Sequence, residues 1–80
     1  MSNLQFELTD VDPQYFFSRD NLNSLKLSFP KIKLVQRGQT IKALGDKNEL
    51  KKFDKKFRSL LNYYSEFNSM DPNVINDIVV

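Results

Sequence analysis

The sequence predicts an α+β fold in which helices cover one face of a three-stranded antiparallel sheet. Three patterns lead to this expectation. Apolar and polar residues alternate over residues 4–8, two short alternating runs flank a glycine within residues 31–46, and apolar residues recur at helical spacing over residues 50–67. The expected order is strand, two helices, two strands, a long helix and a short helix. We expect the first strand to pair with the third.

The first strand is expected to lead into two helices. Asp12 suits a helix N-cap, because its carboxylate can accept a backbone N–H, and Pro13 suits the first helical position. A pair such as Asp10 and Asp12 could also suggest a cation site, but two carboxylates before a proline are typical of a turn and a cap. The segment SRDN, residues 18–21, separates this helix from a second one that ends at Pro30. The apolar residues of the second helix are Leu22, Leu25 and Phe29.

The segment KIKLVQRGQTIKALGD, residues 31–46, is typical of a β-hairpin and contains the only two glycines of the chain. Their spacing does not match a phosphate-binding loop. With Arg37 and Gly38 as a two-residue turn, Lys33 would face Lys42 directly across the hairpin. Two lysines in that position repel unless an anion neutralises them or their side chains splay into solvent. One face would be basic and the other apolar, the apolar residues being Ile32, Leu34, Ile41 and Ala43.

A long amphipathic helix follows, and its apolar stripe covers about 120° of a helical wheel. We expect this stripe in the core, and its members are Leu50, Phe53, Phe57, Leu60, Leu61, Tyr64 and Phe67. The opposite face is basic and is either a solvated surface or a surface that tracks phosphates, formed by Lys51, Lys52, Lys55, Lys56 and Arg58. Asp71 and Pro72 then repeat the cap and proline that begin a helix, the short last one.

Composition excludes most catalytic chemistry. The chain has no cysteine and no histidine, which removes the commonest nucleophilic, metal-binding and general-base side chains. We therefore expect no catalytic residue and no metal site. The net charge of +2 conceals a basic middle, residues 26–58, with eleven Lys and Arg against three acids. Without a signal-like N-terminus or a membrane-length apolar run, a cytoplasmic location is expected.

The segment DNLNSLKLSFPKIKLVQRGQTIKALGD, followed by the amphipathic helix, resembles the N-terminal domain of PhoH-like proteins, the phosphate-starvation-inducible predicted ATPases. The shared features are N-L-x-x-L before a short strand, an R-G hairpin turn and a following strand of the I-x-I-x-G type. The resemblance covers residues 4–80. It implies a KH-like fold of type I order, β-α-α-β-β-α, plus a short C-terminal helix, so that residues 1–80 form a single domain of a longer protein. ATP and Mg²⁺ are then expected only in the P-loop ATPase domain of the parent, and no cofactor in this segment.

In KH domains nucleic acid lies beside a G-x-x-G loop between the first two helices. The matching segment here, residues 18–21, has no glycine and contains Asp20. The resemblance implies an accessory domain that binds RNA, or another single-stranded nucleic acid, weakly and delivers it to the linked ATPase domain. The alternative is a protein-interaction or oligomerisation module that docks onto the ATPase domain without binding nucleic acid. The candidate nucleic-acid contacts are Ser18, Arg19, Asn21, Lys31, Lys33, Arg37, Lys42, Lys51, Lys52 and Lys55.

Overall fold

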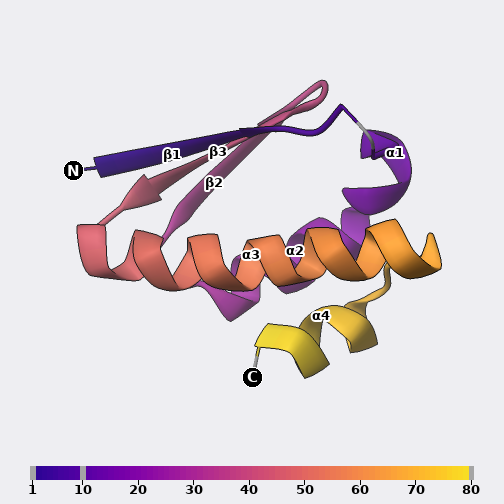
Figure 1. Cartoon of the computed structure of the whole chain (residues 1–80). Coiled ribbons are helices and arrows are strands. Elements are labelled where there is room, and N and C mark those ends of the chain that lie inside the picture. The colour runs from indigo at the N-terminus through magenta and orange to yellow at the C-terminus, as the bar shows by residue number, and fades with distance from the viewer. Residues whose placement is uncertain (1, 10, 80) are drawn as a thin grey trace.

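The computed structural model describes residues 2–9 and 11–79 and confirms the α+β fold (Figure 1). The elements are β1 (Ser2–Glu7), α1 (Pro13–Phe16), α2 (Arg19–Ser28), β2 (Lys33–Arg37), β3 (Thr40–Gly45), α3 (Lys47–Phe67) and α4 (Pro72–Val79). The three strands form one antiparallel sheet in the order β1-β3-β2, so β1 pairs with β3 as predicted. This element order and sheet agree with the KH-like arrangement that we expected.

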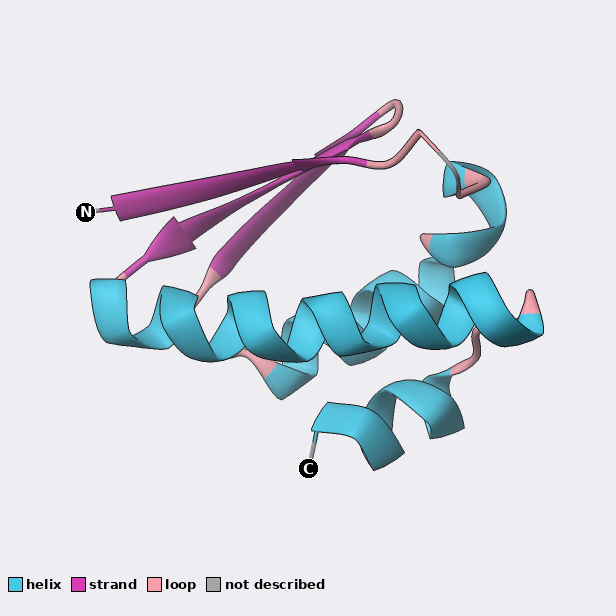
Figure 2. Cartoon of the chain, in the orientation of Figure 1, coloured by secondary structure: helices cyan, strands magenta, loops and turns pink. Residues whose placement is uncertain are grey.

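The sheet and the helices form layers, with the helices on one side of the sheet (Figure 2). Helix α3 runs beneath the sheet and contacts β1 and β3, while α4 packs against α2 and α3. In the part of the chain that the structure describes, the other face of the sheet carries no helix. That face is therefore open to solvent along all three strands.

Each described helix begins at a side chain that accepts a backbone N–H and so satisfies one of the unpaired donors of the first turn. The acceptors are Asp12, Ser18, Asp46 and Asp71, at distances of 3.0, 3.4, 3.2 and 3.0 Å from the nitrogens of Gln14, Asn21, Asn48 and Val74. Asp12 is thus confirmed as a cap. Asp10, its partner in the D-x-D pattern, lies outside the described residues.

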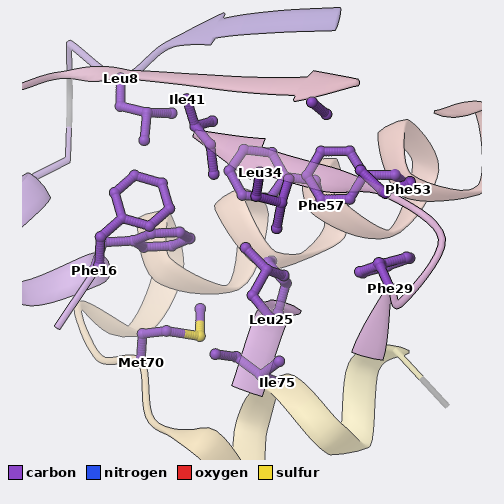
Figure 3. Packing of buried hydrophobic residues seen from close by; sticks show 14 of the residues in the cluster. Leu8, Phe16, Leu25, Phe29, Leu34, Ile41, Phe53, Phe57, Met70 and Ile75 are labelled. Atoms are coloured by element: carbon purple, nitrogen blue, oxygen red, sulfur yellow. The ribbon is translucent and has the colours of Figure 1, made fainter. Parts of the chain in front are cut away.

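Phe53 and Phe57, two aromatic residues of α3, lie within the core (Figure 3). Phe53 and Phe57 are completely buried and stack at 5.2 Å between ring centroids. Phe6 of β1 packs on Phe57 at 4.8 Å, and Phe29 after α2 packs on Phe53 at 5.0 Å. The α3 stripe therefore joins the sheet to α2, which confirms the assignment of its central residues to the core.

The prediction that Phe67 lies in the core is wrong, because 60% of this residue is exposed. Phe67 is the last residue of α3, and the chain reverses at Asn68, which has a φ of 52°. The reversal places Met70 in the core instead, and the Phe67 ring packs on Tyr63, at 4.7 Å between ring centroids. Helical periodicity identifies the face of α3 on which Phe67 lies. It does not show how far along α3 other segments pack against that face.

The predicted hairpin turn is wrong by one residue. The central turn residues are Gly38 and Gln39, so Arg37 faces Thr40 and Lys33 faces Leu44 rather than Lys42. Gly38 has a φ of +57°, and Gln39 does not have a positive φ, which is the pattern of a type II′ turn with glycine first. The predicted turn would have put Arg37 at the position that favours glycine. Moving the turn by one residue shifts the cross-strand partner of each residue by two positions. Because side chains alternate between the two faces of a strand, the predicted apolar and basic faces are retained.

Candidate nucleic-acid interface

The segment of residues 18–21 begins helix α2 and does not form an open loop. The Ser18 hydroxyl accepts the Asn21 backbone N–H and is therefore already engaged. Asn21 is only 3% exposed, and its side-chain amide donates to the carbonyl oxygens of Tyr15, at 3.3 Å, and Met70, at 3.1 Å. This burial removes Asn21 from the candidate contacts. Arg19 stays exposed, although the exposed Asp20 follows it directly.

A cleft lies between α1 and the tip of the β2-β3 hairpin. It is lined by Asp12, Gln14, Phe17, Gln36, Gly38 and Gln39. The Gln36 amide donates to the Gly38 carbonyl oxygen at 2.7 Å, which ties this side chain to the turn. Glutamines can bond to the edges of bases, but the lining includes a carboxylate and no cation. The cleft thus offers hydrogen bonds without a charge partner for a phosphate.

The open face of the sheet brings together three of the candidate cations. Its outward-facing residues form three rows across the strands, Asn3–Leu44–Lys33, Gln5–Lys42–Val35 and Glu7–Thr40–Arg37. Lys33, Arg37 and Lys42 are exposed, whereas three of their uncharged neighbours, Val35, Thr40 and Leu44, are half-buried. Together with Gln5, they line a shallow hollow that runs between Arg37 and Lys42. We name this surface the open sheet face.

The cations of the open sheet face lack acidic partners. Among residues 2–9 and 11–79, the ion pairs within 4.0 Å are Lys52 with Glu49 and Arg58 with Asp54, both on α3. Glu7 is the single carboxylate among the outward-facing residues of the three described strands. The face thus carries three positive charges against one negative charge.

Lys31 lies near the same end of the sheet as Lys33. Its carbonyl oxygen would be 3.2 Å from a Cβ placed on Gly45, which shows how closely the chain before β2 passes the end of β3. Lys31 is exposed, and Lys33 follows two residues later opposite Leu44. Lys31 therefore lies close to the end of the sheet, just before the strand that carries Lys33.

The lysines of α3 form a separate set. Lys51, Lys52 and Lys55 are exposed on a helix that packs beneath the opposite face of the sheet. Two other basic residues of this helix have structural contacts: the Lys56 ammonium donates to the Ile78 carbonyl oxygen at 3.4 Å, and the Arg58 guanidinium lies 5.7 Å from the centre of the Phe6 ring. The ten candidates accordingly divide among the start of α2, the open sheet face and α3.

The residues that sequence reasoning missed are the neutral ones between the cations. Gln5, Thr40 and Leu44 line the hollow with Lys42, but they meet only through the pairing of β1 and β2 with β3. Alternation over residues 4–8 placed Gln5 on the polar face of its strand. No local signal indicates which residues of the other strands lie beside it.

Comparison with protein-family models, with curated proteins and with solved structures finds no match. In the described part of the chain, no helix is long and apolar enough to cross a membrane. Over the same residues, acidic side chains do not gather into a group of three that could hold a metal ion. The exposed cations of the open sheet face can bind an anion electrostatically.

Proposed function

We propose that this chain is an accessory nucleic-acid-binding domain of KH-like fold, with RNA as its partner, linked to a P-loop ATPase domain of the PhoH type. One observation carries the proposal. The basic segment, residues 26–58, runs from the end of α2 through the hairpin into α3, and ten of its eleven cationic residues are exposed. A polyanion that neutralises such cations releases its own counterions, which supplies most of the free energy of non-specific binding.

The domain would act by holding RNA near the ATPase domain in the cytoplasm. It would carry out no catalysis itself, and ATP and Mg²⁺ would bind to the ATPase domain. The KH-like order of elements supports this role, although the G-x-x-G loop is replaced by the capped start of α2. Binding would therefore depend on side-chain cations and would be weak.

The test is a fluorescence-anisotropy titration of the 80-residue chain with a labelled single-stranded RNA at about 50 and 200 mM salt. We expect binding at the lower salt concentration and a marked loss of affinity at the higher one. Parallel titrations with single-stranded DNA and with duplex RNA show which nucleic acid is preferred. Absence of binding to any of them at low salt, or affinity that is indifferent to salt, would exclude the proposal.

The second candidate is a protein-interaction or oligomerisation module that docks onto the ATPase domain. Leu27 and Phe67 favour it, because they are 81% and 60% exposed and their burial in a contact would be favourable. Size-exclusion chromatography with light scattering tests this candidate. A stable dimer that Leu27→Ser or Phe67→Ser dissociates would support it, and a monomer that binds RNA would support the first proposal.

A further inference from the structure

The geometry points to the open sheet face as the surface on which the nucleic acid lies. The side chains of this face contact the phosphates and sugars and do not recognise the bases. This inference rests on the proposed function and assigns its site. It places the ligand on the side of the sheet away from the helices, whereas the KH-like resemblance implies the groove beside the first two helices. Four features of the structure support the assignment.

The first feature is the spacing of the cations. Lys33 and Arg37 are four residues apart on β2, so their Cα atoms lie about 13 Å from each other. Lys42 faces Val35, midway between them on the neighbouring strand, which puts its Cα about 8 Å from each. The three long side chains form a triangle that can contact phosphates along a flexible single strand.

The second feature is the floor between these charges. Val35, Thr40 and Leu44 are half-buried and form a shallow hollow with Gln5 at its side. A mixed apolar and hydroxyl floor suits the sugar of a nucleotide, and the Gln5 amide can bond to sugar hydroxyl or phosphate oxygen atoms. The hollow therefore complements the backbone of a nucleic acid.

The third feature is the absence of aromatic rings from this surface. None of the nine outward-facing residues in the three described strands is Phe, Tyr or Trp. Sheets that read RNA bases do so by stacking them on aromatic side chains. Without such rings, this face contacts the backbone, and its affinity should depend little on base sequence and strongly on salt.

The fourth feature is the unsuitability of the alternative surfaces. The cleft between α1 and the hairpin tip is lined by Asp12 and no cation. The Ser18 hydroxyl and the Asn21 amide at the start of α2 are used within the fold. The open sheet face is thus the surface that combines exposed cations with an uncovered hollow.

The experiment compares two double variants that lose the same charge. Lys33→Gln with Lys42→Gln removes two cations of the open sheet face, and Lys52→Gln with Lys55→Gln removes two exposed cations of α3. Each is titrated with labelled oligouridylate and oligoadenylate by anisotropy at the two salt concentrations used above. Circular dichroism verifies that both variants are folded, which is expected because all four side chains are exposed.

Three phosphate contacts give a logarithmic salt slope of about −2, so the unmodified chain should lose about 20-fold in affinity between about 50 and 200 mM salt. The variant with Lys33→Gln and Lys42→Gln keeps one phosphate contact and should lose about 3-fold in affinity over the same salt range. The variant with Lys52→Gln and Lys55→Gln should lose as much affinity as the unmodified chain. The two oligonucleotides should bind within about 3-fold of each other, because no base is stacked. Equal slopes for the two variants, or a strong preference for one base, would overturn the inference.

Amide chemical shifts of the isotope-labelled chain locate the ligand without any substitution. On addition of oligouridylate, we expect shifts at residues of β2 and β3, including Lys33, Val35 and Lys42. Shifts confined to α3, or to Gln14 and Gln39 beside the cleft, would overturn the assignment but leave the proposed function standing. No binding by the unmodified chain would instead remove the proposed function itself.

An acidic peptide is the other polyanion that this face could hold. Oligoglutamate with the charge of the oligonucleotide is therefore used as a competitor. We expect it to displace RNA at least 10-fold less well than unlabelled RNA does, because it lacks the sugars that the hollow accommodates. Equal or better displacement would overturn the assignment to nucleic acid and identify the face as a docking site for an acidic protein segment.

Discussion

The side-chain amide nitrogen of Asn21 lies 3.1 Å from the carbonyl oxygen of Met70, forty-nine residues further along the chain. The same amide donates to the Tyr15 carbonyl oxygen at 3.3 Å. One buried side chain thus connects α1, α2 and the turn before α4. Because a buried carbonyl without a donor is costly, this residue should be more important for stability than its polar character suggests.

Asn21→Ala should lower the free energy of unfolding by about 1–3 kcal/mol, since it removes the donor to the buried Met70 carbonyl. The Tyr15 carbonyl also loses the amide but keeps the Ser18 backbone N–H as a donor. Asn23→Ala is the matched control, an exposed asparagine two residues away on the same helix, and it should change stability by less than about 0.5 kcal/mol. Urea denaturation followed by circular dichroism measures both. Equal effects at the two positions would mean that the Asn21 hydrogen bonds contribute nothing.

Phe57→Ala and Phe67→Ala test the extent of the apolar stripe of α3. Removal of the completely buried Phe57 ring should cost about 3–5 kcal/mol. Removal of Phe67 should cost at most about 1 kcal/mol, because this residue is 60% exposed and its ring pairs with Tyr63 at the end of the helix. Where the first variant is too unstable for a full melt, its loss of helical signal in buffer is the readout. A Phe67→Ala loss comparable to that of Phe57→Ala would place Phe67 in the core after all.

Gly38→Ala tests the position of the hairpin turn. Gly38 has a φ of +57°, and a Cβ added there would meet no atom within 4 Å, so the cost comes from the backbone alone. We expect a loss of about 1–2 kcal/mol, against less than about 0.5 kcal/mol for Gln39→Ala in the same turn. Thermal melts measure the loss of stability of the two variants. A larger effect at Gln39 would contradict the type II′ assignment.

Lys33→Glu separates the observed register from the one that the sequence suggested. A directly opposed Lys33 and Lys42 would gain up to about 1 kcal/mol from this change. Because Lys33 faces Leu44, we expect a change in stability of less than about 0.5 kcal/mol. Lys55→Glu on α3 is the control. Denaturant melts measure the free energy of unfolding of both variants. A clear stabilisation by Lys33→Glu alone would restore the direct lysine pair.

Much of the fold could be predicted because its signals are local. Alternation over residues 4–8 and helical spacing over residues 50–67 depend on neighbours within a few positions, and the cap residues Asp12 and Asp71 act on the turn that follows them. The candidate site was less predictable. Its cations could be recognised by type, but their division between α3 and the open sheet face depends on which side of each element is covered.

The sequence by itself determined the order of elements, the apolar and basic faces of the hairpin, and the concentration of positive charge in the middle of the chain. The tertiary structure decided which residues face one another across the strands, why Asn21 is buried, and why Phe67 is not. The physical reason is the range of the interactions. Periodicity and capping act within a few residues, whereas the Asn21–Met70 hydrogen bond and the uncovered sheet face arise from segments that meet only when the chain has folded.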